Sequence, residues 1–215
     1  MKLLKYLLML LPLTIFGAGN AFAAPAKSSA ADMLAATAAA EKSSGRMGGI
    51  MYGENYAFMI TAPDGWVLDN EAGKQDGLDA VFYPDGESWQ EAETVMYVNT
   101  ASLDNNKDYS TLDQFMKYDS ENFANARVVK GDDIKMGKDA VAKVKYFTYL
   151  SKNHENFEAV AYLQHEQKEQ ADVAKGRTAI MFVMSSRSRE GFEASKPAFQ
   201  SLVKSYIPMA KTKGD

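Results

Sequence analysis

The sequence contains no cysteine. This absence excludes disulfide bonds, thiolate metal ligands, a cysteine nucleophile and a lipid-bearing N-terminal cysteine. Only two histidines occur among the 215 residues. The serine-hydrolase elbow G-x-S-x-G and the glycine motifs that cradle phosphates are also missing. The sequence therefore predicts no catalytic residue, no metal and no cofactor, and we expect a protein that is not an enzyme.

The chain also lacks the excess of basic residues that is typical of nucleic-acid binding. Its 24 lysines and arginines stand against 28 aspartates and glutamates, which gives a net charge of −4 and a pI near 5.3. Proteins that bind nucleic acid normally carry a basic patch or stripe, and no cluster of Lys and Arg indicates one here. We therefore expect no nucleic-acid partner.

The first residues have the pattern of a secretory signal peptide, which we assign to residues 1–23. Lys2 and Lys5 precede an apolar run, and small residues lead to a cleavage site between Ala23 and Ala24. The run contains Pro12 and is shorter than the roughly 20 residues that a membrane span needs. The sequence thus predicts a periplasmic or secreted protein with no stable membrane insertion after cleavage.

After this segment, the composition predicts one folded domain between two poorly structured ends. Residues 24–51 are rich in alanine, end in the pair Gly48 and Gly49, and are predicted to form a flexible tail or linker. Residues 52–208 are long enough to bury a core of their own and form the predicted domain. Residues 209–215 are expected to be a frayed C-terminus.

The domain alternates strand-like and helix-like segments in an order that favours an α+β fold. Strands are expected near residues 56–61, 66–70, 78–83, 93–101, 127–134, 140–150, 157–164 and 177–184. Several are apolar on both faces, which is typical of central strands that are covered on both sides. Short polar connections favour antiparallel pairing, so we expect an antiparallel sheet of about seven strands with helices on both faces.

Two helices are predicted to cover the sheet. The first begins after Ser110, its expected N-cap, and places Leu112, Phe115 and Met116 on one side. The second spans about residues 188–207 and contains Pro197, which either kinks the helix or begins a new one.

Three segments resemble the PsbP-like fold: "FMITAPDGWVL", "VFYPDG" with "VMYV", and "PAFQSLVKSYI" after "RTAIMFVM". The fold is shared by PsbP, a Ran-binding nuclear import factor and the Eag effector chaperones. The resemblance covers about residues 52–207 and is closest to exported bacterial proteins of that fold. It implies a PsbP-like α/β sandwich and a non-catalytic binding role, since the best-known members act by docking onto other proteins.

Aromatic residues are the candidate partner-binding residues. Trp89 lies in the polar stretch "GESWQEAE", between two predicted strands. It either packs back across the hairpin or is exposed as an anchor for a partner, because tryptophan is enriched at interface hot spots. Tyr83 and Tyr97 are expected at the same edge, and Trp66 is expected as a core or rim residue.

Two segments resemble metal-binding motifs but lack residues that those motifs require, and one group of carboxylates allows two interpretations. "HEQKE" at His165 has Glu169 where a zincin helix needs its second histidine, so we interpret it as a solvated hairpin. "DNNKD" at residues 104–108 lacks the glycine and the final glutamate of a calcium loop. Asp85, Glu91 and Glu93 near Trp89 fit either a solvated loop or an acidic sugar-type pocket.

The sequence therefore favours a periplasmic, non-catalytic accessory protein that docks onto an unidentified protein or envelope component. A protein that binds a small, sugar-like molecule is the first alternative. A hydrolase based on two carboxylates is the second.

Overall fold

The computed structural model describes residues 48–53, 55–123, 125–136, 140–151, 154–167 and 176–209. The predicted signal peptide, its cleavage site at Ala23 and Ala24, residues 24–47 of the predicted tail and residues 210–215 lie outside the described residues.

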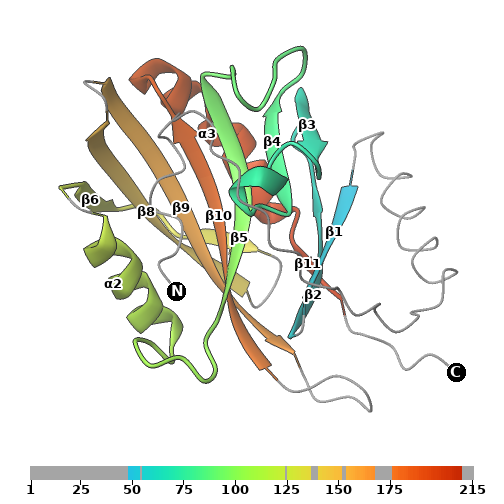
Figure 1. The fold of residues 1–215 in the computed structure, drawn as a ribbon, viewed down its shortest axis with the longest axis vertical. Helices are drawn as coiled ribbons and strands as arrows, with labels where there is room; N and C mark the ends of the chain where they lie inside the picture. Colours follow the sequence, from blue (N-terminus) through green and yellow to red (C-terminus); the bar gives the residue numbers. More distant parts are fainter. Residues whose placement is uncertain are drawn as a thin grey trace, which may run out of the picture.

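An antiparallel sheet of eight strands forms the centre of the described fold (Figure 1). Its strands pair in the order β3-β4-β5-β10-β9-β8-β6, and β7 also pairs with β8. Their bounds are β3 Trp66–Asp69, β4 Ala80–Pro84, β5 Thr94–Ser102, β6 Arg127–Lys130, β7 Ile134–Met136, β8 Ala140–Ser151, β9 His154–Gln167 and β10 Gly176–Ser186. The predicted antiparallel sheet is thus confirmed. It has eight strands instead of about seven, and the strand predicted over residues 56–61 is not one of them.

The single strand predicted over residues 127–134 is divided into β6 and β7. Gly131 lies between them, and a Cβ atom there would stand 2.8 Å from side-chain atoms of Val144 and Tyr146. The chain crosses close over β8 at this glycine, and the polar pair Asp132 and Asp133 follows. A close approach of this kind requires glycine and interrupts the strand.

A second, three-stranded sheet was not predicted. It consists of β1 (Gly48–Gly53), β2 (Tyr56–Thr61) and β11 (Ile207–Pro208) in the order β1-β2-β11. Residues 48–51, predicted to belong to the flexible linker, are therefore part of a strand. A Cβ atom at Gly49 would stand 2.7 Å from Leu68 Cδ2, so this glycine permits close packing rather than flexibility.

One helix covers each face of the large sheet. Helix α2 spans Leu112–Asn122, and its N-cap is Thr111, whose hydroxyl accepts a hydrogen bond from the Gln114 N–H. The predicted cap, Ser110, instead donates to the Gln114 side chain. Helix α3 spans Arg189–Lys204 behind its N-cap Ser188 and runs through Pro197, so no new helix begins there.

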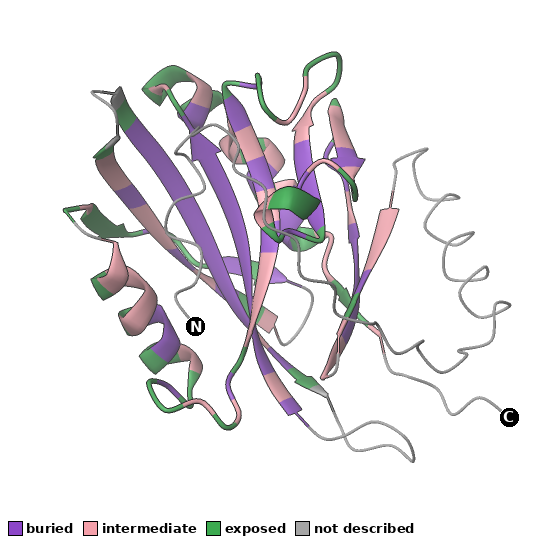
Figure 2. Ribbon diagram, viewed as in Figure 1, coloured by how far each residue is buried: buried purple, intermediate pink, exposed green. Residues whose placement is uncertain are grey.

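The buried side chains form two separate cores, and Figure 2 shows that the central strands β9 and β10 are largely buried. Even-numbered residues of β10, such as Ile180 and Phe182, face α3 and the small sheet, whereas Met181 and Val183 face α2. Strand β10 is buried on both faces, as its apolar sequence predicts. Each large apolar side chain buried in this way contributes about 1.5–3 kcal/mol. We call the two sides of the sheet the α3 face and the α2 face.

Candidate functional site

Trp89 lies in the connection between β4 and β5 and folds back over the α2 face of the sheet. Its indole N–H donates to Asp76 Oδ2 at 3.2 Å, and Asp76 ends the short 3₁₀ helix η1 (Lys74–Asp76). Its ring meets Tyr97 edge to face, with 6.3 Å between the ring centroids. The side chain is half-buried, so it both packs on the sheet and presents part of its surface to solvent.

Tyr83 lies on the same face and is fixed by a carboxylate of the neighbouring strand. Its hydroxyl donates to Asp69 Oδ2 at 2.8 Å. The backbone N–H groups of Ala72 and Glu71 and the Tyr83 hydroxyl all stabilise the charged form of Asp69 and lower its pKa. We call the residues Tyr83, Trp89 and Tyr97, with Asp69 and Asp76, the Trp89 platform.

Trp66 does not belong to this platform. It pairs with Pro84 in the sheet and packs against the core of the α3 face. Side chains of adjacent strand residues alternate between faces, so Trp66 and Tyr83 point to opposite sides. The structure thus brings three of the four predicted aromatic residues onto one face and separates the fourth.

The platform lies in the acidic part of the molecule. Residues 55–106 contain ten aspartates and glutamates but a single basic residue, Lys74. Asp85, Glu91 and Glu93 are exposed, which agrees with their interpretation as a solvated loop. Arg187 closes the base of this loop by donating to the backbone oxygens of Glu91 and Ala92, at 2.5 and 2.6 Å.

Next to the platform, the α2 face contains a buried carboxyl group that the sequence analysis missed. Glu158 in β9 is only 4% exposed. Its Oε1 accepts a hydrogen bond of 2.8 Å from the Tyr149 hydroxyl, and the Ser185 hydroxyl also interacts with the carboxyl group. The other carboxyl oxygen, Oε2, accepts no hydrogen bond from the described residues.

Burial raises the pKa of Glu158 from 4.5 to about 7, because the charged form loses its hydration. Hydrogen bonds from Tyr149 and Ser185 act in the opposite direction, and the nearby Asp119 raises the pKa further. The pKa of Tyr97 is raised well above its ordinary value, first by burial and then by the charge of Glu158. Tyr97 therefore links the Trp89 platform to the buried carboxyl group.

Helix α2 packs over the same face of the sheet, next to Glu158, and is bonded to β8 and β9. The Tyr162 hydroxyl donates to Asp119 Oδ2 at 2.5 Å. Lys145 donates to the Met116 backbone oxygen and to the Ser120 hydroxyl, at 2.8 and 2.6 Å. These bonds join β8 and β9 to the last turns of α2, where a lysine also compensates the partial negative charge of the helix end.

The sequence did contain a signal for Glu158. It is the one charged residue in the stretch "FEAVAYL", and a lone carboxylate inside an apolar strand is rarely left without a partner. The partners themselves come from β8, β10 and α2, so their identity depends on the pairing register.

The patterns that resembled metal motifs have structural roles. His165 is only 3% exposed, and its Nδ1 lies 2.7 Å from the Tyr206 hydroxyl, so the interpretation as a solvated hairpin is wrong. Strand β9 is longer than predicted and carries His165 into the core. Asp104 forms an ion pair with Arg177, whose Nε and Nη2 both donate to Asp104 Oδ1. Within the described ranges, no group of three or more His, Asp or Glu side chains could hold a metal ion.

The fold is similar to that of LpqN from Mycobacterium tuberculosis, a protein described as involved in cell envelope biogenesis. The TM-score is 0.54 at 11% sequence identity, and the match covers 80% of this chain and 96% of LpqN. At this identity the likeness shows the fold alone. A protein from Bacteroides thetaiotaomicron matches with a TM-score of 0.39 and 13% identity, over 71% of this chain and 45% of that one.

No protein-family model matches the sequence, and no curated protein matches it. In the part of the chain that the structure describes, neither helix is both long and apolar enough to span a bilayer.

Proposed function

We propose that this chain is an extracytoplasmic accessory protein that acts by docking onto a protein or envelope partner through the Trp89 platform. The carrying observation is that Trp89 stays half-exposed, on an acidic part of the surface, although its ring is held in place by Tyr97 and Asp76. An aromatic ring that is already ordered loses little conformational entropy on binding, which favours its use as an anchor.

Three further observations support this proposal. The signal-peptide pattern favours export, the chain contains no recognised catalytic motif, and LpqN, which shares the fold, is described as involved in cell envelope biogenesis. The finer assignment to the PsbP-like fold is part of the proposal and rests on the sequence resemblance. The excess of carboxylates around Trp89 favours a partner surface that carries lysine or arginine, because complementary charges steer association.

The test is Trp89→Ala in the mature protein, measured by affinity capture from an envelope extract and by thermal unfolding. We expect partner capture to fall about tenfold or more, which is the range of a hot-spot tryptophan. We expect the free energy of unfolding to fall by only about 1 kcal/mol, the scale of one aromatic contact and one long, partly buried hydrogen bond.

Tyr52→Ala is the matched control, because Tyr52 is a 62% exposed aromatic residue on the small sheet. It should leave both capture and stability unchanged. A large fall in melting temperature for Trp89→Ala, or equal capture by both variants, would show that the platform is structural and not a docking surface.

A hydrolase remains a second candidate because Glu158 has a raised pKa and interacts with Asp119, as a carboxylate pair would. Both carboxyl groups, however, already accept hydrogen bonds from tyrosines, and Glu158 is almost fully buried. A general acid must come within hydrogen-bonding distance of its substrate. Hydrolysis of a glycoside panel that is lost in Glu158→Gln would favour this candidate over docking.

A further inference from the structure

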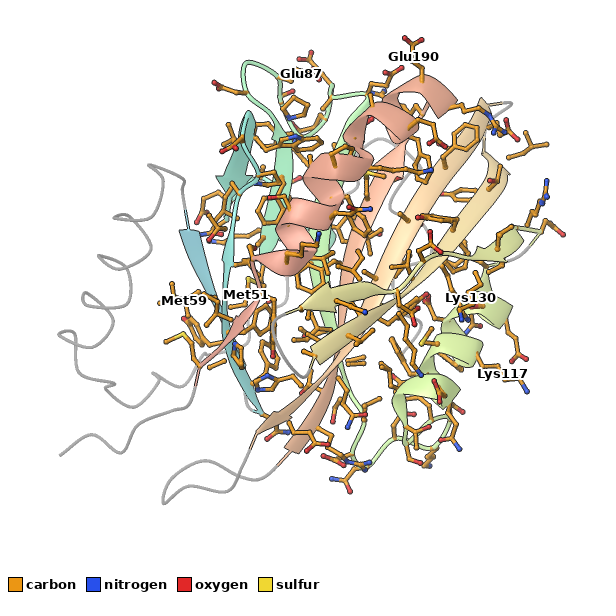
Figure 3. The ribbon with its side chains drawn as sticks, turned by 180° about the vertical axis from the view of Figure 1, so that it is seen from behind. Met51, Met59, Glu87, Lys117, Lys130 and Glu190 are labelled. Carbon is orange, nitrogen blue, oxygen red and sulfur yellow. The ribbon has the colours of Figure 1, made fainter. Side chains whose placement is uncertain are left out.

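The edge of the large sheet at β6 differs from the rest of the surface. Strand β6 is the last in the pairing order, at the end opposite to β3, and all four of its residues are exposed. Figure 3 shows Lys130 at this edge, far from Glu87 in the β4–β5 connection. The surface is therefore separate from the Trp89 platform.

Exposed apolar side chains are concentrated at this edge. Among the described residues, six large apolar side chains are exposed, and three of them lie in β6 or in the adjoining end of β8: Val128, Val129 and Leu150. On the α3 face, Val129 is 46% exposed and Leu150 is 79% exposed, while Val128 on the α2 face is 38% exposed. A sheet edge with apolar side chains on both faces can hold an added strand by its side chains as well as by its backbone.

The pairing register shows which backbone groups of β6 point outward. Gly131 N–H donates to the Val144 oxygen, and this bond continues the ladder in which Val129 pairs with Tyr146. In an antiparallel pair, hydrogen-bonded and non-hydrogen-bonded positions alternate. Arg127 and Val129 therefore bond inward to β8, whereas the N–H and C=O groups of Val128 and Lys130 face away from it.

Two basic side chains of β6 itself flank these outward groups. In the sequence, residues 125–151 contain six lysines and arginines against three aspartates, although Lys143 pairs with Asp113 and Lys145 donates to helix α2. Arg127 and Lys130 are exposed, and within the described residues neither forms an ion pair. Arg127 also lines a pocket of about 200 Å³ together with Asn125, Thr148, Leu150, Glu155 and Arg189.

We propose that the β6 edge binds an extended segment of a partner protein, rich in apolar and acidic residues, which adds to the sheet as a further strand. The outward N–H and C=O groups of Val128 and Lys130 would pair with the segment's backbone. Val129 and Leu150 would contact its apolar side chains, and Arg127 and Lys130 would attract its carboxylates.

The same charges argue against a second copy of β6 as the occupant. Basic residues at a sheet edge discourage pairing between identical edges, because two such strands repel each other. The same residues attract an acidic strand. The basic edge therefore favours an acidic partner and does not prevent strand addition altogether.

The probe is a synthetic hexapeptide of alternating valine and glutamate, titrated into the isotopically labelled mature protein and followed by amide hydrogen exchange. In the free protein, the amides of Val128 and Lys130 should exchange fast, and those of Val129 and Gly131 should be protected. At saturation, Val128 and Lys130 should gain at least tenfold protection, because their N–H groups enter a new ladder. A peptide of alternating valine and lysine should give no such gain.

Val128→Pro is the diagnostic variant, since it removes an outward donor while the inward bonds of Arg127 and Val129 stay intact. It should reduce peptide affinity at least tenfold without lowering the melting temperature, whereas Trp89→Ala should bind the peptide normally. If the variant does not fold, Val129→Glu, which repels the peptide, replaces it. Absence of peptide binding, equal binding of both peptides, binding only to anionic vesicles, or protection of these amides by self-association would each overturn the proposal.

Discussion

At the scale of single residues, Glu158 is a carboxyl group taken almost entirely out of water. It is buried on a central strand, and its charged form keeps only the hydrogen bonds from Tyr149 and Ser185. A carboxyl group whose pKa is raised in the folded state binds a proton more tightly there than in the unfolded chain. Stability therefore falls as the pH rises between the two pKa values.

For Glu158 this window extends from about pH 4.5 to about pH 7. The change in stability across it is on the order of 3 kcal/mol, from roughly 1.4 kcal/mol per pKa unit. Glu158→Gln removes this titration, so we expect the variant to gain about 3 kcal/mol relative to the wild type between pH 5 and pH 8. Urea unfolding at the two pH values measures the change. An equal difference between the two proteins at both pH values would mean that Glu158 titrates normally.

The position of Trp89 could be predicted only in part from its neighbours in the sequence. Its polar neighbours left two alternatives, packing across the hairpin or exposure, and the half-buried ring satisfies part of each. The contacts that decide its position, Asp76 and Tyr97, lie 13 and 8 residues away in the chain. A composition argument cannot identify such partners. Its role as an anchor for a partner stays a prediction.

At the scale of elements, the start of α2 tests the local rules of helix capping. Two hydroxyl residues precede the helix, and the sequence predicted Ser110 as the cap, whereas the structure places Thr111 there with a bond to the Gln114 N–H. A cap must have extended backbone geometry and lie three residues before its donor. Both serine and threonine satisfy the residue preference, so only the backbone decides between them.

Thr111→Ala should therefore cost about 1 kcal/mol of the free energy of unfolding, the usual loss for a removed N-cap. Ser110→Ala is the matched control and should cost less than about 0.5 kcal/mol, because its side-chain bond is exposed. Chemical denaturation of both variants measures the difference. The reverse order of the two losses would restore Ser110 as the cap.

Glycine positions in the sequence predicted only some of the turns and linkers correctly. Gly65 forms the turn before β3, with φ of 75° and a bond from Trp66 N–H to the Pro63 oxygen, as a glycine in a Pro-Asp-Gly turn can. Gly48 and Gly49 were instead predicted to end a flexible linker, yet both are in strand β1. The same residue types serve turns, flexible linkers and close contacts, and sequence does not separate these uses.

At the scale of the whole molecule, the small sheet is joined to the large one by close packing at Gly49. Gly49→Ala places a Cβ atom 2.7 Å from Leu68 Cδ2, in a side chain that is 95% buried and has little room to move. Overpacking of this kind costs about 1–3 kcal/mol. We expect this loss in thermal unfolding, and Gly49→Ala with Leu68→Ala should recover part of the penalty through added space. An unchanged melting temperature for Gly49→Ala would mean that β1 does not pack tightly on the large sheet.

The described molecule also separates its charges along the sheet. In the sequence, residues 55–106 contain ten aspartates and glutamates against one lysine, whereas residues 125–151 contain six lysines and arginines against three aspartates. The two proposed surfaces lie at these two ends and have opposite preferences in a partner. Binding at both should weaken with added salt, because exposed charges are screened within about 10 Å at 0.1 M ionic strength.

The amino-acid pattern alone determined the antiparallel sheet, the two covering helices and the doubly buried strands, because hydrophobic periodicity records which faces meet a core. It also indicated that Trp89, Tyr83 and Tyr97 belong together. Only the tertiary structure shows that a second sheet forms and that Trp66 lies on the opposite face from Tyr83. It also shows which residues contact Glu158 and which backbone groups of β6 point outward. These features depend on pairing register and on contacts between distant segments, and a shift of one residue in register would turn each side chain to the other face.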